Sequence, residues 1–328
     1  MNVELKLLSV LTEGGVHSGT AIGERLGVSR VAVKKRIDQL RKRGLPVDIV
    51  PGKGYRLSSG ISLLSEPAIL AALPRFVQEK LQSVEVHQSL PSTNRYLREA
   101  EPQKAGRAHA VLAESQPEGQ GRRGRGWIAT PYRNIMLSIS WYCETWPNHP
   151  AGLSLAFAVA VHQVLSGYLP KDSADLKIKW PNDILLNGRK LAGLLVDASG
   201  EASGGCKLVF GVGINVVIAD QDSTEIDQPW AQLQQPDSPA LDRNLIAADV
   251  VSSLVEAICL YESQGFEPFR AYWNEQAAYV GRAVRLSNEQ HTFDGVLKGV
   301  DETGALILET SSGERLSFTQ ADISLRPR

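Results

Sequence analysis

One stretch of glycines and arginines has residue types and spacing that point directly to chemistry. In "ESQPEGQGRRGRGW", residues 114–127, a G-x-G-x-x-G pattern is interleaved with three arginines, at Arg122, Arg123 and Arg125. Glycines let the backbone approach a ligand closely, and arginines supply permanently charged planar groups that bind phosphate. The segment therefore has three interpretations: a dinucleotide-binding turn, a basic loop for another anion, or a solvated turn.

The residues after the glycines oppose the dinucleotide-binding interpretation. In that motif the last glycine leads directly into a helix, whose N-terminus holds the pyrophosphate. Here the chain continues as "RGWIATPYRNIMLSI", in which Gly126 and Pro131 disfavour a helix and the next periodic stretch is strand-like. The phosphate-binding pattern G-x-x-x-x-G-K-[ST] does not occur in the sequence either. A basic anion-binding loop and a plain turn remain.

Four other short motifs lie in the same part of the chain. They are "STN" at 92–94, "KWPND" at 179–183, "KLAG" at 190–193 and "GVGIN" at 211–215. Each is weak alone, because Ser92 to Asn94 suit a helix cap, Asp183 a turn and Lys190 a hairpin surface. Their weight comes from their combination and order.

The first 62 residues predict a winged helix-turn-helix. Apolar spacing indicates helices at 3–11, 20–27 and 29–44, with a tight turn at Gly27 and an N-cap at Ser29. Two short β-like runs flank Pro51–Gly54 and form the wing, and residues 56–67 are the expected linker. The DNA-facing candidates are Ser29, Arg30, Lys34, Lys35 and Lys53.

Charge is divided unevenly along the chain, although the net charge is −1. Residues 1–60 hold 11 lysines and arginines against 5 acids, whereas the rest holds 24 against 31. A basic helix face alone is usually a solvated face, but the turn, the wing and this charge balance agree. A basic head on an acidic body indicates an anionic partner for the head.

The remaining chain predicts two further units. From about 63 to 276, strand-like segments alternate with an apolar helix at 152–168 and a long helix at 242–264, and Asn187-Gly188 is typical of a type I′ hairpin. Beyond 277, short strand-like runs separated by polar turns predict a small antiparallel barrel. The fold class expected is therefore α+β, in three domains: 1–62, 63–276 and 277–328.

Composition indicates an intracellular globular protein. The chain has 328 residues and no N-terminal signal peptide pattern, and its most apolar run, 151–165, is too short to span a bilayer. Three widely spaced cysteines form neither a disulfide framework nor a zinc motif. We expect a cytoplasmic location, no membrane partner and no metal held by assigned protein side chains.

The five central segments, in this order, resemble the biotin protein ligases. Together with the head motifs "HSG" and "VPGKGY" and the tail "ISLR", the chain resembles the bifunctional members that also repress the biotin operon. The resemblance implies a class II synthetase-like central sheet and an SH3-like C-terminal barrel. One residue departs from the family loop G-R-G-R-R-G, because Gln120 stands where its first arginine is usual.

The resemblance also implies a reaction in two steps. Biotin and ATP give biotinyl-5′-AMP and pyrophosphate, and a lysine of the biotin carboxyl carrier protein of acetyl-CoA carboxylase then accepts the biotin. The implied catalytic residues are Lys190, Arg122 and Asp183. Implied biotin contacts are Ser92, Thr93, Asn94, Gln116, Gln120, Gly121, Arg122 and Lys190, and adenylate contacts are Arg122, Arg125, Asn182 and Asn215.

Further expectations concern partners and alternatives. The resemblance implies Mg²⁺ with ATP, operator DNA of biotin genes, and a homodimer when biotinyl-5′-AMP is bound. Three other functions remain open: a lipoate-type ligase, which shares the adenylating logic, a biotin-sensing repressor without catalysis, and a ligase whose head no longer binds an operator, against which the basic third helix argues. The arginine-rich loop and the basic head argue against the first, and Lys190, Arg122 and Asp183 argue against the second.

Overall fold

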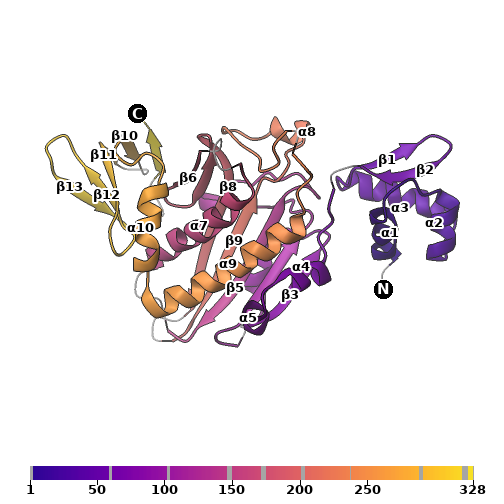
Figure 1. The fold of residues 1–328 in the computed structure, drawn as a ribbon, viewed down its shortest axis with the longest axis horizontal. Helices are drawn as coiled ribbons and strands as arrows, with labels where there is room; N and C mark the ends of the chain where they lie inside the picture. The colour runs from indigo at the N-terminus through magenta and orange to yellow at the C-terminus, as the bar shows by residue number, and fades with distance from the viewer. Residues whose placement is uncertain are drawn as a thin grey trace.

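Three sets of elements follow one another along the chain. The structure, a computed structural model, describes residues 3–58, 61–101, 104–145, 150–170, 175–200, 204–236, 238–287, 291–319 and 324–327. Figure 1 shows the N-terminal helices on one side of the central sheet and the C-terminal strands on the opposite side. The expected order of a helical head, a central mixed sheet with helices and a C-terminal antiparallel sheet is confirmed.

The head contains the predicted helices and hairpin. They are α1 (Val3–Thr12), α2 (Gly19–Leu26), α3 (Arg30–Lys42), β1 (Val47–Val50) and β2 (Gly54–Leu57). Gly27 ends α2 with a left-handed φ of 67°, and the Ser29 hydroxyl caps α3 by accepting a hydrogen bond from Ala32 N at 3.2 Å. One face of α3 is fully buried in the core of the head. The expected linker includes Ser59 and Gly60, which lie outside the described residues.

The central sheet has seven strands in the order β3-β4-β5-β9-β8-β7-β6. Their bounds are β3 (Leu81–His87), β4 (Ala108–Ala113), β5 (Ile135–Cys143), β6 (Leu176–Lys179), β7 (Asp183–Leu186), β8 (Arg189–Gly200) and β9 (Cys206–Ile214). Only the β3–β4 pair is parallel among these neighbours. Asn187 and Gly188 both have positive φ, at 51° and 74°, which confirms the predicted β7–β8 turn.

Helices cover both faces of the sheet. The apolar helix α7 (Pro150–Gly167) packs on α9 (Arg243–Gln264), and both belong to the main core on one face. On the other face, α6 (Thr93–Glu99) buries Leu97 against Val111 and Val209. By length and composition α9 is apolar enough to cross a membrane, but 61% of its most apolar window is buried inside the protein, so it is a core helix here.

Several short elements were not individually expected from the sequence. They are α4 (Glu66–Ala72), α5 (Arg75–Lys80), α8 (Asp220–Ser223), α10 (Glu267–Gln276) and the single 3₁₀ turn η1 (Arg122–Gly124). All but α10 span at most seven residues, too few for a clear helical period in the sequence. Three of these helices, α4, α5 and α10, pack against the long core helix α9.

The C-terminal strands form an antiparallel sheet in the order β13-β12-β11-β10-β14. Their bounds are β10 (Ala283–Ser287), β11 (Thr292–Val300), β12 (Leu306–Glu309), β13 (Arg315–Phe318) and β14 (Ser324–Pro327). Residues of this sheet, including Val284, Leu286 and Leu297, belong to the same hydrophobic cluster as the central domain. The C-terminal sheet and the central domain therefore share one continuous hydrophobic core.

The head joins the body through a buried polar and aromatic contact. Tyr132, which follows the glycine-arginine loop, is fully buried and belongs to the hydrophobic core of the head. Beside it, Arg243 and Glu114 form an ion pair of 2.8 Å with side chains that are 3% and 0% exposed. Glu114 also accepts a hydrogen bond from Leu64 N at 2.6 Å, so the chain leaving the head is held by the body.

Candidate functional site

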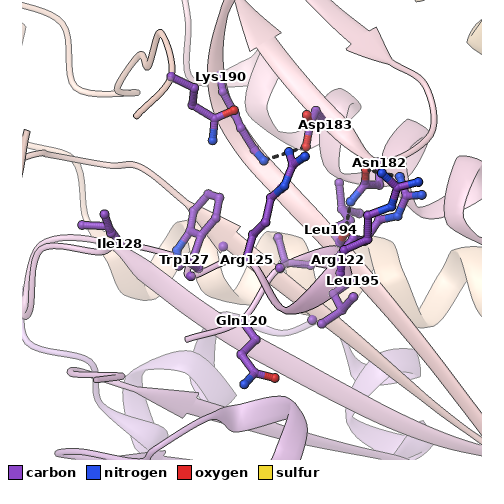
Figure 2. A pocket seen from close by; sticks show the side chains of 18 of the residues that line it. Gln120, Arg122, Arg125, Trp127, Ile128, Asn182, Asp183, Lys190, Leu194 and Leu195 are labelled. Atoms are coloured by element: carbon purple, nitrogen blue, oxygen red, sulfur yellow. Dashed lines mark hydrogen bonds and ion pairs between the residues drawn. The ribbon is translucent and has the colours of Figure 1, made fainter. Parts of the chain in front are cut away.

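A cavity of about 860 Å³ gathers the motifs that the sequence distributed over more than one hundred residues. It is lined by the start of α6, the glycine-arginine loop, the β6–β7 turn, and residues of β8 and β9. Figure 2 shows Lys190, Asp183, Asn182, Arg122 and Arg125 around this cavity. Every expected ligand-binding residue lines it except Asn215.

One end of the cavity is built from neutral polar groups. Ser92 is the N-cap of α6, and the Gln116 side-chain oxygen accepts hydrogen bonds from Thr93 N at 2.8 Å and Thr93 Oγ1 at 3.0 Å. The Ser138 hydroxyl lies 2.7 Å from Thr93 Oγ1 and 2.5 Å from Asn94 Oδ1. Ser92 to Asn94 thus cap a helix and line a cavity at once, so the two interpretations of this motif are compatible.

The Asn94 side chain lies directly over Gly211 of β9, which has no side chain to exclude it. Its Nδ2 donates to Asp197 Oδ2 at 3.1 Å, and a Cβ on Gly211 would collide with its amide group. This contact explains why the "GVGIN" motif begins with a glycine on a strand. The arrangement offers fixed donors and acceptors for a ring that is small and polar at its edge.

The opposite part of the cavity is strongly cationic. Lys190 Nζ is 2.8 Å from Asp183 Oδ1, and Lys179 Nζ is 4.0 Å from Asp183 Oδ2. Burial lowers the pKa of Lys179; the Asp183 carboxylate opposes this shift, and Lys190, Arg326 and Arg125 add to it. Six cationic side chains line the cavity against three carboxylates, those of Asp183, Glu225 and Asp227. This excess leaves a net positive field, which is suited to anionic substrates.

The glycine-arginine loop is a tight hairpin over the cavity. Gln120 pairs with Gly126 across it, and Gly121 N donates to Arg125 O at 2.7 Å. Its tip is the 3₁₀ turn η1, in which Arg123 and Gly124 have φ values of 59° and 68°. Gln120 has an exposed side chain that lines the cavity, while its backbone maintains the hairpin.

Two arginines of this hairpin point across the cavity. Arg122 Nη1 donates to Asn182 Oδ1 at 3.2 Å, and Asn182 Nδ2 donates to Leu194 O at 2.5 Å, which links the loop to the β6–β7 turn and to β8. Figure 2 shows the Arg125 side chain directed toward Asp183 and Lys190. The basic-loop interpretation is therefore supported by geometry, and the plain solvated turn is not.

Trp127 lines the cavity, although it was not among the site residues predicted from the sequence. Its indole lies over Gly193 and Gly213, which are register partners on β8 and β9, and a Cβ on Gly213 would collide with the ring. Lys190 Nζ is 5.4 Å from the centroid of the same ring. The signal for this contact was present as two strand glycines, because glycine within a strand often marks the close approach of another group.

Asn215 and Arg326 differ most from expectation. Asn215 does not line the cavity, since its Nδ2 donates to Ala231 O at 3.1 Å and to Lys190 O at 3.4 Å; it positions the Lys190 backbone, and its nucleotide contact stays a prediction. Arg326 and Leu325 of β14 line the cavity, although they follow Asp183 by more than one hundred residues. Only the folded C-terminal sheet brings them there.

The head presents its own basic surface. Ser29, Arg30, Lys34, Lys35 and Lys53 are all exposed. The wing is fixed to the start of α2, because His17 and Tyr55 exchange two backbone hydrogen bonds of 2.9 Å, and a Cβ on Gly54 would collide with His17. The basic residues of α3 and of the wing are therefore exposed to solvent, and backbone hydrogen bonds fix the wing relative to α2.

Family models match all three parts of the chain. An HTH domain matches residues 3–56, the biotin/lipoate A/B protein ligase family matches 86–215, and the biotin protein ligase C-terminal domain matches 279–326. The bifunctional ligase/repressor BirA of Escherichia coli is 38% identical over 99% of this chain and 97% of its own length. The chain belongs to the bifunctional ligase/repressor family. It is a biotin protein ligase that carries a helix-turn-helix repressor domain.

Other comparisons agree with this assignment. The bifunctional ligase/repressor BirA of Bacillus subtilis is 32% identical over 97% of both chains. Among solved structures, the biotin protein ligase from Aquifex aeolicus in complex with biotin and ATP has a TM-score of 0.63 at 23% identity, covering 75% of this chain and 100% of that chain. This second similarity is evidence for the fold.

Proposed function

We propose that this ligase condenses biotin with ATP to biotinyl-5′-AMP, transfers the biotin to a lysine of the biotin carboxyl carrier protein of acetyl-CoA carboxylase, and represses biotin genes as the adenylate-bound form. The observation that carries the ligase proposal is the cavity in which Lys190, Asp183, Lys179 and Arg122 adjoin the polar pocket of Thr93 and Gln116. A cationic half beside a neutral polar half matches a negative reaction centre attached to a polar ring.

Lys190 is our candidate for bridging the reacting groups. Biotin carboxylate and the α-phosphate are both negative, so their approach requires a fixed cation between them. Lys190 lies in the cationic part of the cavity against Asp183 and Trp127, which restrict its ammonium group. When biotin carboxylate attacks the α-phosphorus, the bond to the pyrophosphate oxygen breaks, and Arg122 and Arg125 neutralise the charge.

The second step needs an amine that has lost its proton. We assign this task to Asp183, because a carboxylate in hydrogen-bond reach of an incoming ammonium orients it and accepts its proton. The amine nitrogen then attacks the carbonyl carbon of the mixed anhydride, and AMP leaves. Asn182 holds the loop beside this place through Arg122, and the loop shields the anhydride from water.

The biotin end is assigned to the polar pocket. Ser92, Thr93, Asn94 and Gln116 offer both donors and acceptors for the ureido group, and Gln120 and Gly121 lie where the loop passes over the cavity. The Gln116 side-chain oxygen already accepts two hydrogen bonds from Thr93, so Gln116 acts on the ligand chiefly by holding Thr93 in place. Residues of the opposite half are left for the nucleotide.

Mg²⁺ fits this site as a companion of ATP. Among the described residues, no group of three or more His, Cys, Asp or Glu side chains could hold a metal ion. Glu225 and Asp227 line the cavity, and one or two carboxylates together with substrate phosphates are the usual ligands of Mg²⁺. When bound, the ion would neutralise triphosphate charge, and these two residues would hold it.

The repressor proposal rests on the exposed basic surface of the head. We propose that biotinyl-5′-AMP favours a homodimer, which presents two heads to a two-fold symmetric operator of biotin genes. We further propose the boundaries 1–62, 63–276 and 277–328, a class II synthetase-like central domain, an SH3-like C-terminal barrel and a cytoplasmic location. The seven-stranded mixed sheet and the five-stranded antiparallel sheet support the two fold assignments.

One incubation tests the ligase proposal against its alternatives. The full-length protein is mixed with ATP and Mg²⁺, with biotin and a biotin-carrier domain in one sample and lipoate and a lipoyl-carrier domain in another, and the carrier is weighed intact. We expect the mass of one biotinyl group, biotin less one water, to be added only in the first sample. Addition of lipoate would support the lipoate-type ligase, and no addition in either would support a sensor without catalysis.

A further inference from the structure

Val31 is an apolar side chain in an unusual position on the head. It is 78% exposed, more than any other exposed large hydrophobic side chain of the described residues. Two residues later Val33 is fully buried, so the core of the head is already supplied from the other face of α3. Valine is also a poorer helix former than alanine by a few tenths of a kcal/mol, so Val31 stabilises neither the core nor the helix.

The position of Val31 in α3 indicates which partner its exposed side chain would meet. It is the second residue of the second helix of a helix-turn-helix, immediately after the Ser29 cap and Arg30. In this motif the N-terminal residues of the second helix contact base edges in the major groove. Residues three and four positions apart share a helix face, so Lys34 and Lys35 lie beside Val31, and both are exposed.

Arg30 is turned toward a different part of the head. A Cβ on Gly19 would lie 3.3 Å from Arg30 Cγ and 3.4 Å from Tyr55 Cε2, so the Arg30 stem runs along the start of α2 next to the wing. The first turn of α3 therefore presents one apolar side chain, with cations on either side of it. Binding to DNA phosphates explains the exposed cations. It does not explain the exposed valine, because an apolar side chain makes no favourable contact with a phosphate.

We propose that Val31 determines base specificity by packing on the 5-methyl group of a thymine in each operator half-site. Thymine is the one base with a methyl group in the major groove, and apolar side chains recognise it by contact. In this arrangement Lys34 and Lys35 contact the neighbouring backbone or bases and contribute affinity, whereas Val31 contributes selectivity. The inference rests on the proposed role of the head in operator binding.

A selection experiment identifies the position that Val31 recognises. Full-length protein with biotin, ATP and Mg²⁺ selects duplexes from a library with a randomised central segment, and the bound DNA is sequenced. We expect wild type to enrich thymine at one position of each half-site, and Val31→Ala, whose shorter side chain makes less apolar contact, to show a weaker preference there while keeping the others. The matched control is Val280→Ala, an exposed valine of the body at 39%, which should select as wild type does.

A second measurement removes the methyl group from the DNA instead of the protein. Uracil replaces the selected thymine, which preserves the hydrogen-bonding edge and deletes only the 5-methyl group. Wild type should bind about four-fold more weakly for each half-site changed, the value of one buried methyl group. Val31→Ala should discriminate less than wild type between the thymine and uracil duplexes. Biotin transfer should match wild type in both valine variants, since neither residue lines the cavity.

Different failures separate this inference from the function on which it rests. If wild type enriches no sequence from the library, operator binding by the head is wrong, and the inference fails with it. If wild type enriches a sequence and Val31→Ala enriches it with the same thymine preference, only the assignment of Val31 is overturned. Equal wild-type binding to the thymine and uracil duplexes would overturn it as well, whatever the behaviour of the variant.

Discussion

Lys190 is the residue on which the proposed chemistry depends most. Its ammonium group is aimed by Asp183 at 2.8 Å and lies against the Trp127 ring. Loss of a fixed charge directed at a transition state costs about 10²–10³ in rate, so Lys190→Ala should reduce ATP–pyrophosphate exchange by that factor. Lys53→Ala, on the wing, is the control. Exchange within a few-fold of wild type would remove Lys190 from the mechanism.

The pKa of Lys179 gives a prediction with a defined sign. Burial lowers it, and the Asp183 carboxylate raises it, so Asp183→Asn should lower it further. Lys179 then loses its proton at lower pH, and the alkaline limb of the pH profile of pyrophosphate exchange should move to lower pH. Asp175→Asn, outside the cavity lining, should leave the limb in place. A limb that does not move in Asp183→Asn would show that the Lys179 charge is not used.

Among elements, the glycine-arginine hairpin has the clearest testable role. Arg122 ties it to Asn182, and a hydrogen bond to a charged group contributes about 1.5–3 kcal/mol. Arg122→Gly should therefore accelerate release of biotinyl-5′-AMP by roughly 10- to 100-fold. Stopped-flow dissociation measures this rate. Gln120→Arg should be near neutral, because the Gln120 backbone already maintains the hairpin by pairing with Gly126.

Gly193 of β8 and Gly213 of β9 are register partners, and together they leave the space that the Trp127 indole occupies. A Cβ on Gly213 would displace the indole, and overpacking of this kind costs about 1–3 kcal/mol. Gly213→Ala should weaken biotin binding in a calorimetric titration, whereas Gly167→Ala should not, since no atom lies within 4 Å of a Cβ there. Unchanged affinity would mean that the indole has room to move aside without consequence for the ligand.

The contrast between these elements shows what the sequence could and could not reveal. The Asn187-Gly188 turn and the Ser29 cap were predictable, because each depends on a local backbone preference. The anion-binding loop was predictable from composition, but its partner Asn182 and the position of Trp127 required strands far apart in sequence to pair. Asn215 was expected at the ligand, yet it holds the main chain of Lys190 and Ala231, a distinction that no local pattern contains.

At the scale of the whole molecule, the buried ion pair Arg243–Glu114 lies in the body and holds the chain that leaves the head, because Arg243 donates to Ser62 O and Glu114 accepts from Leu64 N. Removing one partner of a buried pair leaves an uncompensated charge and typically costs about 3–5 kcal/mol. Arg243→Met should reduce the free energy of unfolding by this amount in chemical denaturation. Arg270→Met, which breaks the exposed pair with Glu267, should change it little. Similar losses in the two variants would mean that the Arg243 site admits water.

Tyr132 also has a consequence for the modularity of the protein. The head and the body are successive along the chain, which suggests that one could be exchanged for another at the linker. Tyr132 belongs to the body in sequence and to the head in packing, and its burial raises its pKa to about 12. A transplanted DNA-binding head would have to offer a cavity of the same shape, or Tyr132 would become an exposed ring close to the glycine-arginine loop. A chimaera that works must therefore exchange this tyrosine together with the head.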